Sequence, residues 1–299
     1  MKYFLGVLFA VLSGFCNFGG QILQKKAIND VLKADGKLDM KVLVKKPLWI
    51  SGLLLIILIN TVLLAFAQMY IGPALIPGLL ASGFIVLGIG SVKLLGEKLT
   101  KEEIMAIAVL IVAIVLISMS KLSIDADLTR FNDSGFVIRI IIFSIIFTLL
   151  WFALFYGGKR KKNKAVLMAL GAGFPFIMNN VWMQPLFLSM TSLLSGEMVK
   201  LSLIVFFPSA AIMAYVNFLG IVHLQKAMAE GNASIVIPIQ QIPQQVSPII
   251  IYFLIYNLSA PSSYSYVFLL TGIAMIIFAG FILSKRQTKL ENMTNVDTN

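Results

Sequence analysis

Long apolar stretches alternate with short polar segments along the whole chain. A membrane-spanning helix needs about 20 apolar residues, and two of the stretches, 47–92 and 231–284, are long enough for two spans each. Both contain turn-forming residues where a turn is needed, at Gly72-Pro73 and at 257–263. The pattern therefore predicts nine transmembrane helices, near 3–24, 48–71, 74–95, 103–120, 135–157, 165–192, 199–225, 233–256 and 264–284.

Composition supports the same class of protein. Of the 299 residues, 59% are hydrophobic and only 12% are charged, whereas soluble domains carry roughly 25% charged residues. A chain this apolar cannot cover a water-facing surface, so lipid must surround most of it. We therefore expect an all-α polytopic membrane protein. The single cysteine, Cys16, excludes an intramolecular disulfide.

The basic residues are distributed unevenly between the two sides that this topology creates. Nineteen of the 24 Lys and Arg residues fall on the side of the C-terminus and of the loops after the first, third, fifth and seventh helices. The positive-inside rule then predicts a plasma-membrane protein with the N-terminus outside and the C-terminus cytoplasmic. The same distribution explains the net charge of +11, so no nucleic-acid partner is expected. The basic run 159–164 is suited to anionic membrane lipid.

A weak internal repeat relates the two halves of the chain. Ser13-Gly14-Phe15 corresponds to Ala172-Gly173-Phe174, and Ile76-Pro77 corresponds to Ile237-Pro238. The matching helices are five apart and must cross the membrane in opposite senses, as in the inverted repeats of transporters; the alternative is chance similarity between apolar helices. The repeat predicts four segments: 1–121 as the first repeat, 122–163 as a connecting helix and basic loop, 164–285 as the second repeat, and 286–299 as a cytoplasmic polar tail.

Three short motifs suggest a family. Gly96-Glu97 is followed by Leu99-Thr100, the first helix ends in Gln24-Lys25-Lys26, and residues 220–241 read GIVHLQKAMAEGNASIVIPIQQ. In these features the chain resembles the drug/metabolite transporter superfamily with its EamA-type domains, and its layout is most similar to the NIPA-like magnesium transporters. The resemblance implies a glutamate inside the second helix, but this chain has Asn60 there.

The predicted eighth helix concentrates polar chemistry. It carries four glutamines between residues 240 and 245, and Pro238, Pro243 and Pro248 each remove a backbone donor and free a carbonyl. Polar groups in membrane helices usually face a cavity or another helix, so these amides either line a solute path or bond neighbouring helices. The candidate substrate-binding residues are the amides of five predicted helices: Gln21, Asn60, Asn179, Asn180, Gln184, Asn217, Gln240, Gln241, Gln244 and Gln245.

Acidic groups are missing from the interiors of the predicted spans, and the one histidine, His223, is expected near the membrane interface. An embedded enzyme would need a positioned acid, base, nucleophile or metal, so we expect no catalytic residues, no metal site and no cofactor. A scaffold would not need the amides. The sequence predicts a transporter that moves a small neutral, zwitterionic or anionic solute by alternating access. The alternative is a NIPA-like Mg²⁺ transporter, and whether the chain forms a homodimer stays open.

Overall fold

The computed structural model describes residues 2–71, 76–120, 122, 127–158, 163–196 and 199–297. These residues form helices and connecting segments without strands. Each of the nine predicted ranges is mostly helical where it is described, and the described non-helical residues within them are 81–82, 94–95, 120 and 256. The predicted turn at Gly72-Pro73 and the basic residues 159–162 lie outside the described residues.

The elements divide into a first half, α1 to α7, and a second half, α9 to α12, joined by η2 and α8. In the first half and connector the bounds are α1 Lys2–Asp35, α2 Met40–Leu43, α3 Pro47–Leu54, the π-helix η1 Leu55–Ile59, α4 Asn60–Ile71, α5 Ile76–Leu80, α6 Gly83–Lys93, α7 Lys101–Met119, the 3₁₀ helix η2 Leu128–Asn132, and α8 Ser134–Gly158. In the second half they are α9 Lys164–Ser195, α10 Val199–Glu230, α11 Ala233–Ile250, the π-helix η3 Ile251–Ile255, and α12 Ser263–Asp297.

Within the described chain, seven helical segments are long and apolar enough to cross a membrane: α1, the continuous α3–η1–α4, α7, α8, α9, α10 and α12. This confirms a polytopic helical membrane protein. The third predicted span is divided at residues 81–82 into the short helices α5 and α6, and the eighth is the polar, proline-rich α11. The count of nine spans therefore stays a prediction.

Several helix ends follow from local chemistry. α1 continues beyond the predicted end at residue 24 to Asp35 and stops at Gly36, whose φ of +69° suits glycine. α9 likewise ends at Gly196, with φ of 75°. α7 begins with a capping box, in which Thr100 and Glu103 bond each other's backbone N–H groups. α12 extends through the predicted polar tail to Asp297.

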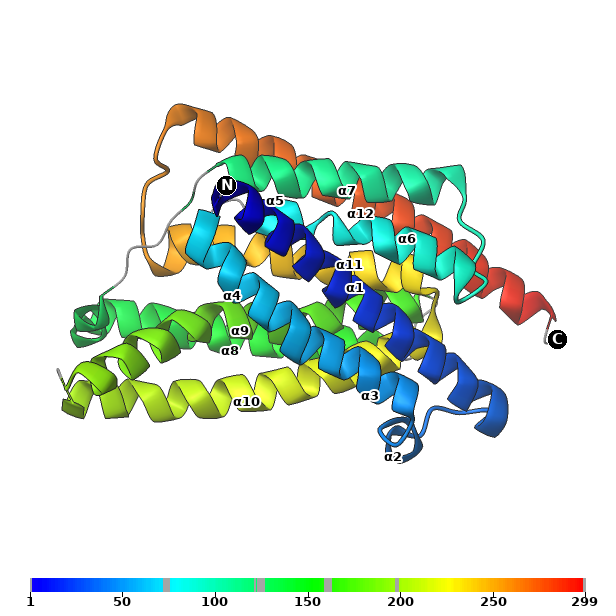
Figure 1. Cartoon of the computed structure of the whole chain (residues 1–299), viewed down its shortest axis with the longest axis horizontal. Helices are drawn as coiled ribbons and strands as arrows, with labels where there is room; N and C mark the ends of the chain where they lie inside the picture. Colours follow the sequence, from blue (N-terminus) through cyan, green and yellow to red (C-terminus); the bar gives the residue numbers. More distant parts are fainter. Residues whose placement is uncertain are drawn as a thin grey trace.

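The helices run roughly along the long axis of the molecule (Figure 1). In the first half α1 packs against α3–α4 and against the broken pair α5–α6; in the second half α9 packs against α10 and α11. Helices α7 and α12 come from different halves and pack against each other along one side (Figure 1). α8 packs on α9.

The buried cores differ between the two ends of the bundle. We call the end that holds Lys25, late in α1, the Lys25 end. There one continuous apolar cluster includes Ile28 and Trp49 from the first half and Leu224 and Met228 from the second. At the opposite end the described apolar residues form two separate clusters. One contains α1, α4 and α5 residues of the first half, and the other contains residues of α8 to α11 and η3.

Candidate functional site

A cavity of about 530 Å³ lies between the two halves. The first half contributes α1, α3, η1, α4 and α5 to its wall, and the second half contributes α9, α10 and α11. Leu, Ile and Phe side chains make up the apolar part of the lining. The polar part consists of uncharged side chains: Asn17, Gln21, Gln24, Asn60, Thr61, Asn179, Asn217, Gln225, Gln240, Gln241 and Gln244.

The structure brings together most of the residues that the sequence singled out. Three of the ten predicted residues, Asn180, Gln184 and Gln245, are absent from the lining of the cavity. The seven that line it come from five helices far apart in the chain: Gln21, Asn60, Asn179, Asn217, Gln240, Gln241 and Gln244.

Sequence reasoning missed four polar lining residues, namely Asn17, Gln24, Thr61 and Gln225. A signal for two of them was present, because Asn17, Gln21 and Gln24 follow one another at spacings of four and three residues. Side chains at that spacing share one face of a helix. The first helix therefore carries an amide stripe comparable to that of α11.

The backbone of α11 is broken by proline, and Asn180 compensates for one break. Pro248 cannot donate to the carbonyl of Gln244. That carbonyl instead accepts hydrogen bonds from Asn180 Nδ2 at 3.3 Å and from Ser247 Oγ at 3.0 Å. Asn180 thus stabilises the irregular helix that presents the glutamines, although it does not line the cavity itself.

Two glycines allow the proline-containing helices to approach their neighbours closely. A Cβ on Gly14 of α1 would lie 2.5 Å from the carbonyl oxygen of Leu80 in α5. A Cβ on Gly173 of α9 would lie 2.5 Å from the carbonyl oxygen of Gln240 in α11. Larger side chains at either position would push α5 or α11 away from the cavity wall.

Hydrogen bonds fix several amides in the wall. Ser13 Oγ donates to Asn60 Oδ1 at 2.6 Å, and Asn60 Nδ2 donates to the carbonyl oxygen of Ile56 at 3.2 Å. On the facing side Asn217 Nδ2 donates to Asn179 Oδ1 at 2.8 Å. The wall is therefore a set of oriented dipoles rather than a set of mobile side chains.

Two further glutamines use the amide nitrogen as a hydrogen-bond donor but leave the amide oxygen without a partner. Gln21 Nε2 donates to Asn17 Oδ1 at 3.4 Å, and Gln240 Nε2 donates to Gln244 Oε1, also at 3.4 Å. The Oε1 atoms of Gln21 and Gln240 are buried and have no hydrogen-bond partner among the described residues. Buried polar atoms are normally paired, so these two oxygens mark unfilled hydrogen-bonding capacity.

Toward the Lys25 end, an amide bridge joins the halves at the boundary of the cavity. Gln225 of α10 donates from Nε2 to Gln24 Oε1 of α1 at 2.8 Å. Its own Oε1 accepts from Trp49 Nε1 of α3 at 3.2 Å. Both glutamines line the cavity, so this bridge forms part of its floor.

Beyond that bridge, a buried lysine and a glutamate make further contacts between the two halves. Lys25 is 6% exposed, and its ammonium donates to the carbonyl oxygens of Met228 and, at 2.8 Å, of Gly231. Glu97 accepts from the backbone N–H groups of Ala233 and Ser234 at 2.6 and 3.0 Å. A carboxylate suits the N-terminus of α11, where backbone donors point outward. Two charged groups of the first half thus hold the α10–α11 junction of the second.

His223 lies outside the cavity lining, in an aromatic cluster. Trp151 Nε1 donates to its Nδ1 at 2.9 Å, and the ring of Phe155 stacks on it with centroids 3.8 Å apart. The sequence suggested a position near the membrane interface, whereas the structure buries the ring between α8 and α10. It packs these helices together.

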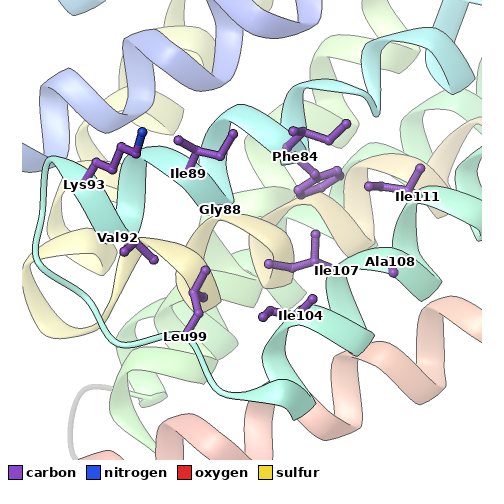
Figure 2. A pocket seen from close by; sticks show the side chains of 11 residues that line it. Phe84, Gly88, Ile89, Val92, Lys93, Leu99, Ile104, Ile107, Ala108 and Ile111 are labelled. Atoms are coloured by element: carbon purple, nitrogen blue, oxygen red, sulfur yellow. The ribbon is translucent and has the colours of Figure 1, made fainter.

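A groove between α6 and α7 is apolar and has a volume of about 460 Å³. Figure 2 shows Phe84 and Ile89 of α6 and Ile104, Ile107 and Ile111 of α7 along it. Lys93, at one end, is its sole polar side chain. This groove lacks the hydrogen-bonding groups that a polar solute needs, so the amide-lined cavity is the candidate site.

Within the described chain, no group of three or more His, Cys, Asp or Glu side chains is placed to hold a metal ion. Comparison with known protein families, with curated proteins and with solved structures found no match to this chain.

Proposed function

We propose that this chain is a membrane transporter of the drug/metabolite type, which moves a small neutral, zwitterionic or anionic solute by alternating access. The observation that carries the proposal is the amide-lined cavity between two halves that are joined by polar contacts at the Lys25 end. A solute held there touches both halves. A rearrangement that breaks the contacts at one end and forms new ones at the other would expose the solute to the other side.

Features of both halves support the inverted repeat on which this mechanism depends. α1 packs on α3–α4 and α5–α6 as α9 packs on α10 and α11. The close approach of Gly14 to Leu80 has its counterpart in the approach of Gly173 to Gln240. Both pairs join the first helix of a predicted repeat to its proline-containing third helix, with sequence offsets of 159 and 160, which follow from the numbering.

The distribution of charge supports an orientation. In the predicted topology, the loops and terminus that carry 19 of the 24 Lys and Arg residues lie on the same side as Lys25. By the positive-inside rule this end faces the cytoplasm. The conformation described above is then closed toward the cytoplasm, and the cavity is reached from outside. Membrane lipid surrounds the exposed apolar faces and fills the groove between α6 and α7.

The test is solute uptake by purified protein in liposomes, with a panel of neutral, zwitterionic and anionic metabolites beside Mg²⁺. Ile221 lines the cavity, so Ile221→Trp should block uptake by filling it. Tyr215, on the same helix and 59% exposed, provides the control Tyr215→Trp, which should transport like the parent. Uptake of no panel member, or equal uptake by the plugged and control variants, would overturn the proposal.

A further inference from the structure

We infer that the cavity selects solutes that bring hydrogen-bond donors, namely ammonium, amide N–H or hydroxyl groups, and that it rejects simple anions. This inference rests on the proposed function; it removes the anions from the proposed solute class and adds organic ammonium cations. The two buried, unpartnered oxygens of Gln21 and Gln240 are its starting point. They belong to opposite halves, α1 and α11, and both side chains line the same cavity.

The unpaired atoms are acceptors because each glutamine uses its Nε2 as the donor to a neighbouring amide oxygen. Gln21 Nε2 faces Asn17 Oδ1, and Gln240 Nε2 faces Gln244 Oε1. Rotating the glutamine amide alone by half a turn would set two oxygens against each other. Leaving a buried acceptor unpaired costs free energy that a donor on a bound solute would recover.

The absence of charged side chains from the cavity lining also favours solutes with hydrogen-bond donors over anions. Every side chain that lines the cavity is neutral. The nearest basic residue in sequence, Lys25, directs its ammonium to the carbonyl oxygens of Met228 and Gly231. A carboxylate or phosphate is usually held by charged donors, and burying one without a partner is expensive. An ammonium or hydroxyl group meets amide oxygens directly.

The position of the two oxygens also connects recognition with movement. A solute with a donor at each end that bonds both Gln21 and Gln240 would link the first half to the second. Such a bridge forms only when both halves are in place around the solute. A solute without donors would leave both oxygens unpaired and would not favour that arrangement.

The experiment measures binding rather than transport, as the shift in melting temperature of the purified full chain. The probes share a four-carbon skeleton. They are 1,4-diaminobutane and 1,4-butanediol as donors, the bis-trimethylammonium analogue of the diamine as a cation without donors, and butanedioate as an anion. We expect the diamine and the diol to raise the melting temperature and the other two to leave it unchanged.

Variants of the two glutamines test whether the shift in melting temperature depends on their oxygens. Gln21→Leu and Gln240→Leu should each weaken the apparent affinity for the diamine about tenfold, as expected for the loss of one hydrogen bond to a charged group. Gln245→Leu, on the same helix but outside the cavity lining, should bind like the parent. The inference fails if no donor probe shifts the melting temperature. It also fails if butanedioate or the bis-trimethylammonium probe shifts it as much as the diamine, or if Gln245→Leu behaves like Gln240→Leu.

Liposome uptake separates this inference from the proposed function. If an anion is taken up and Ile221→Trp blocks that uptake, the transporter proposal stands and the donor rule is wrong. If donors bind as described but nothing is taken up, the donor rule stands and the transporter proposal is wrong.

Discussion

The two ends of this helix bundle are built differently, although the sequence predicts that the two halves of the chain are repeats of one another. At the Lys25 end one apolar core runs across both halves, and Lys25, Glu97 and Gln225 make polar contacts between them. At the opposite end each half has its own apolar cluster. The cavity lies between the halves.

Under the proposed function, this difference between the two ends belongs to one conformation of the transport cycle. If the halves are inverted repeats, the contacts at the Lys25 end have potential counterparts at the opposite end. Forming those contacts while releasing the present ones would move the opening of the cavity from one side to the other.

Removing the buried charge should have the largest effect, because Lys25 binds two carbonyls of the other half. Lys25→Met removes this donor from the buried carbonyl of Met228 and from the half-buried carbonyl of Gly231, and an unpaired buried carbonyl costs about 1–3 kcal/mol. We expect a clearly lower melting temperature and uptake reduced at least about tenfold. The control is Lys26→Met, at the half-buried neighbouring position. If the two variants behave alike in thermal unfolding and liposome uptake, Lys25 does not close this end.

Removing the α11 amides from the wall should stop transport and leave the fold intact. Gln240→Leu combined with Gln244→Leu removes two polar lining residues, and a lost interhelical hydrogen bond in a membrane costs only about 0.6 kcal/mol. Uptake should fall about tenfold or more with a nearly unchanged melting temperature. Gln245→Leu should transport normally. The site assignment is wrong if the double variant transports like the parent, or if Gln245→Leu loses as much transport as the double variant.

Matched glycine substitutions test whether the halves correspond. Gly14→Ala and Gly173→Ala each place a Cβ 2.5 Å from a carbonyl oxygen of the adjacent proline-containing helix, and overpacking of this kind typically costs about 1–3 kcal/mol. Both should lower the melting temperature by similar amounts. Gly157→Ala is the control, because its Cβ would meet nothing within 4 Å. A large effect at only one of the two sites would contradict the correspondence.

The smallest effect is expected for Mg²⁺ uptake by the unmodified chain. Proteins usually bind Mg²⁺ through one or two carboxylates, whereas this cavity presents Asn60, at the position where the resemblance to NIPA-like proteins implies a glutamate. The unmodified chain should not rescue a host deficient in Mg²⁺ uptake at low external Mg²⁺. An Asn60→Glu variant should gain some rescue. Robust rescue by the unmodified chain would instead favour the Mg²⁺ alternative.

Much of the fold could be read from the sequence, because helix length in a membrane depends on the run of apolar residues. The range 135–157 matches α8 within one residue at each end. Helix ends outside the apolar runs were less predictable. α1 continues through the Lys-rich segment to Gly36 because those residues also favour helix, and hydropathy does not report this.

The sequence was enough to predict which types of residue form the site, but not which of these residues bond to one another. The glutamines of α11 stand out because amides and prolines are costly in a membrane helix. Gln24 and Gln225 do not stand out singly, since each is one polar residue near the end of an apolar run. Only the packing of α10 against α1 brings them together at 2.8 Å. Asn180 shows the reverse case, a predicted lining residue that instead satisfies the carbonyl of Gln244.

We propose that the contacts at the Lys25 end close the cavity on one side, and thiol labelling from each face of the membrane can show whether they do. Cys16, the only native cysteine, is replaced by alanine, and Ile221→Cys places a single thiol in the cavity. An impermeant maleimide should label this thiol from outside intact cells and not from the cytoplasmic face of inverted vesicles. Adding Lys25→Met should make it reactive from the cytoplasmic face. Equal labelling from both faces without that change, or no gain with it, would contradict the account.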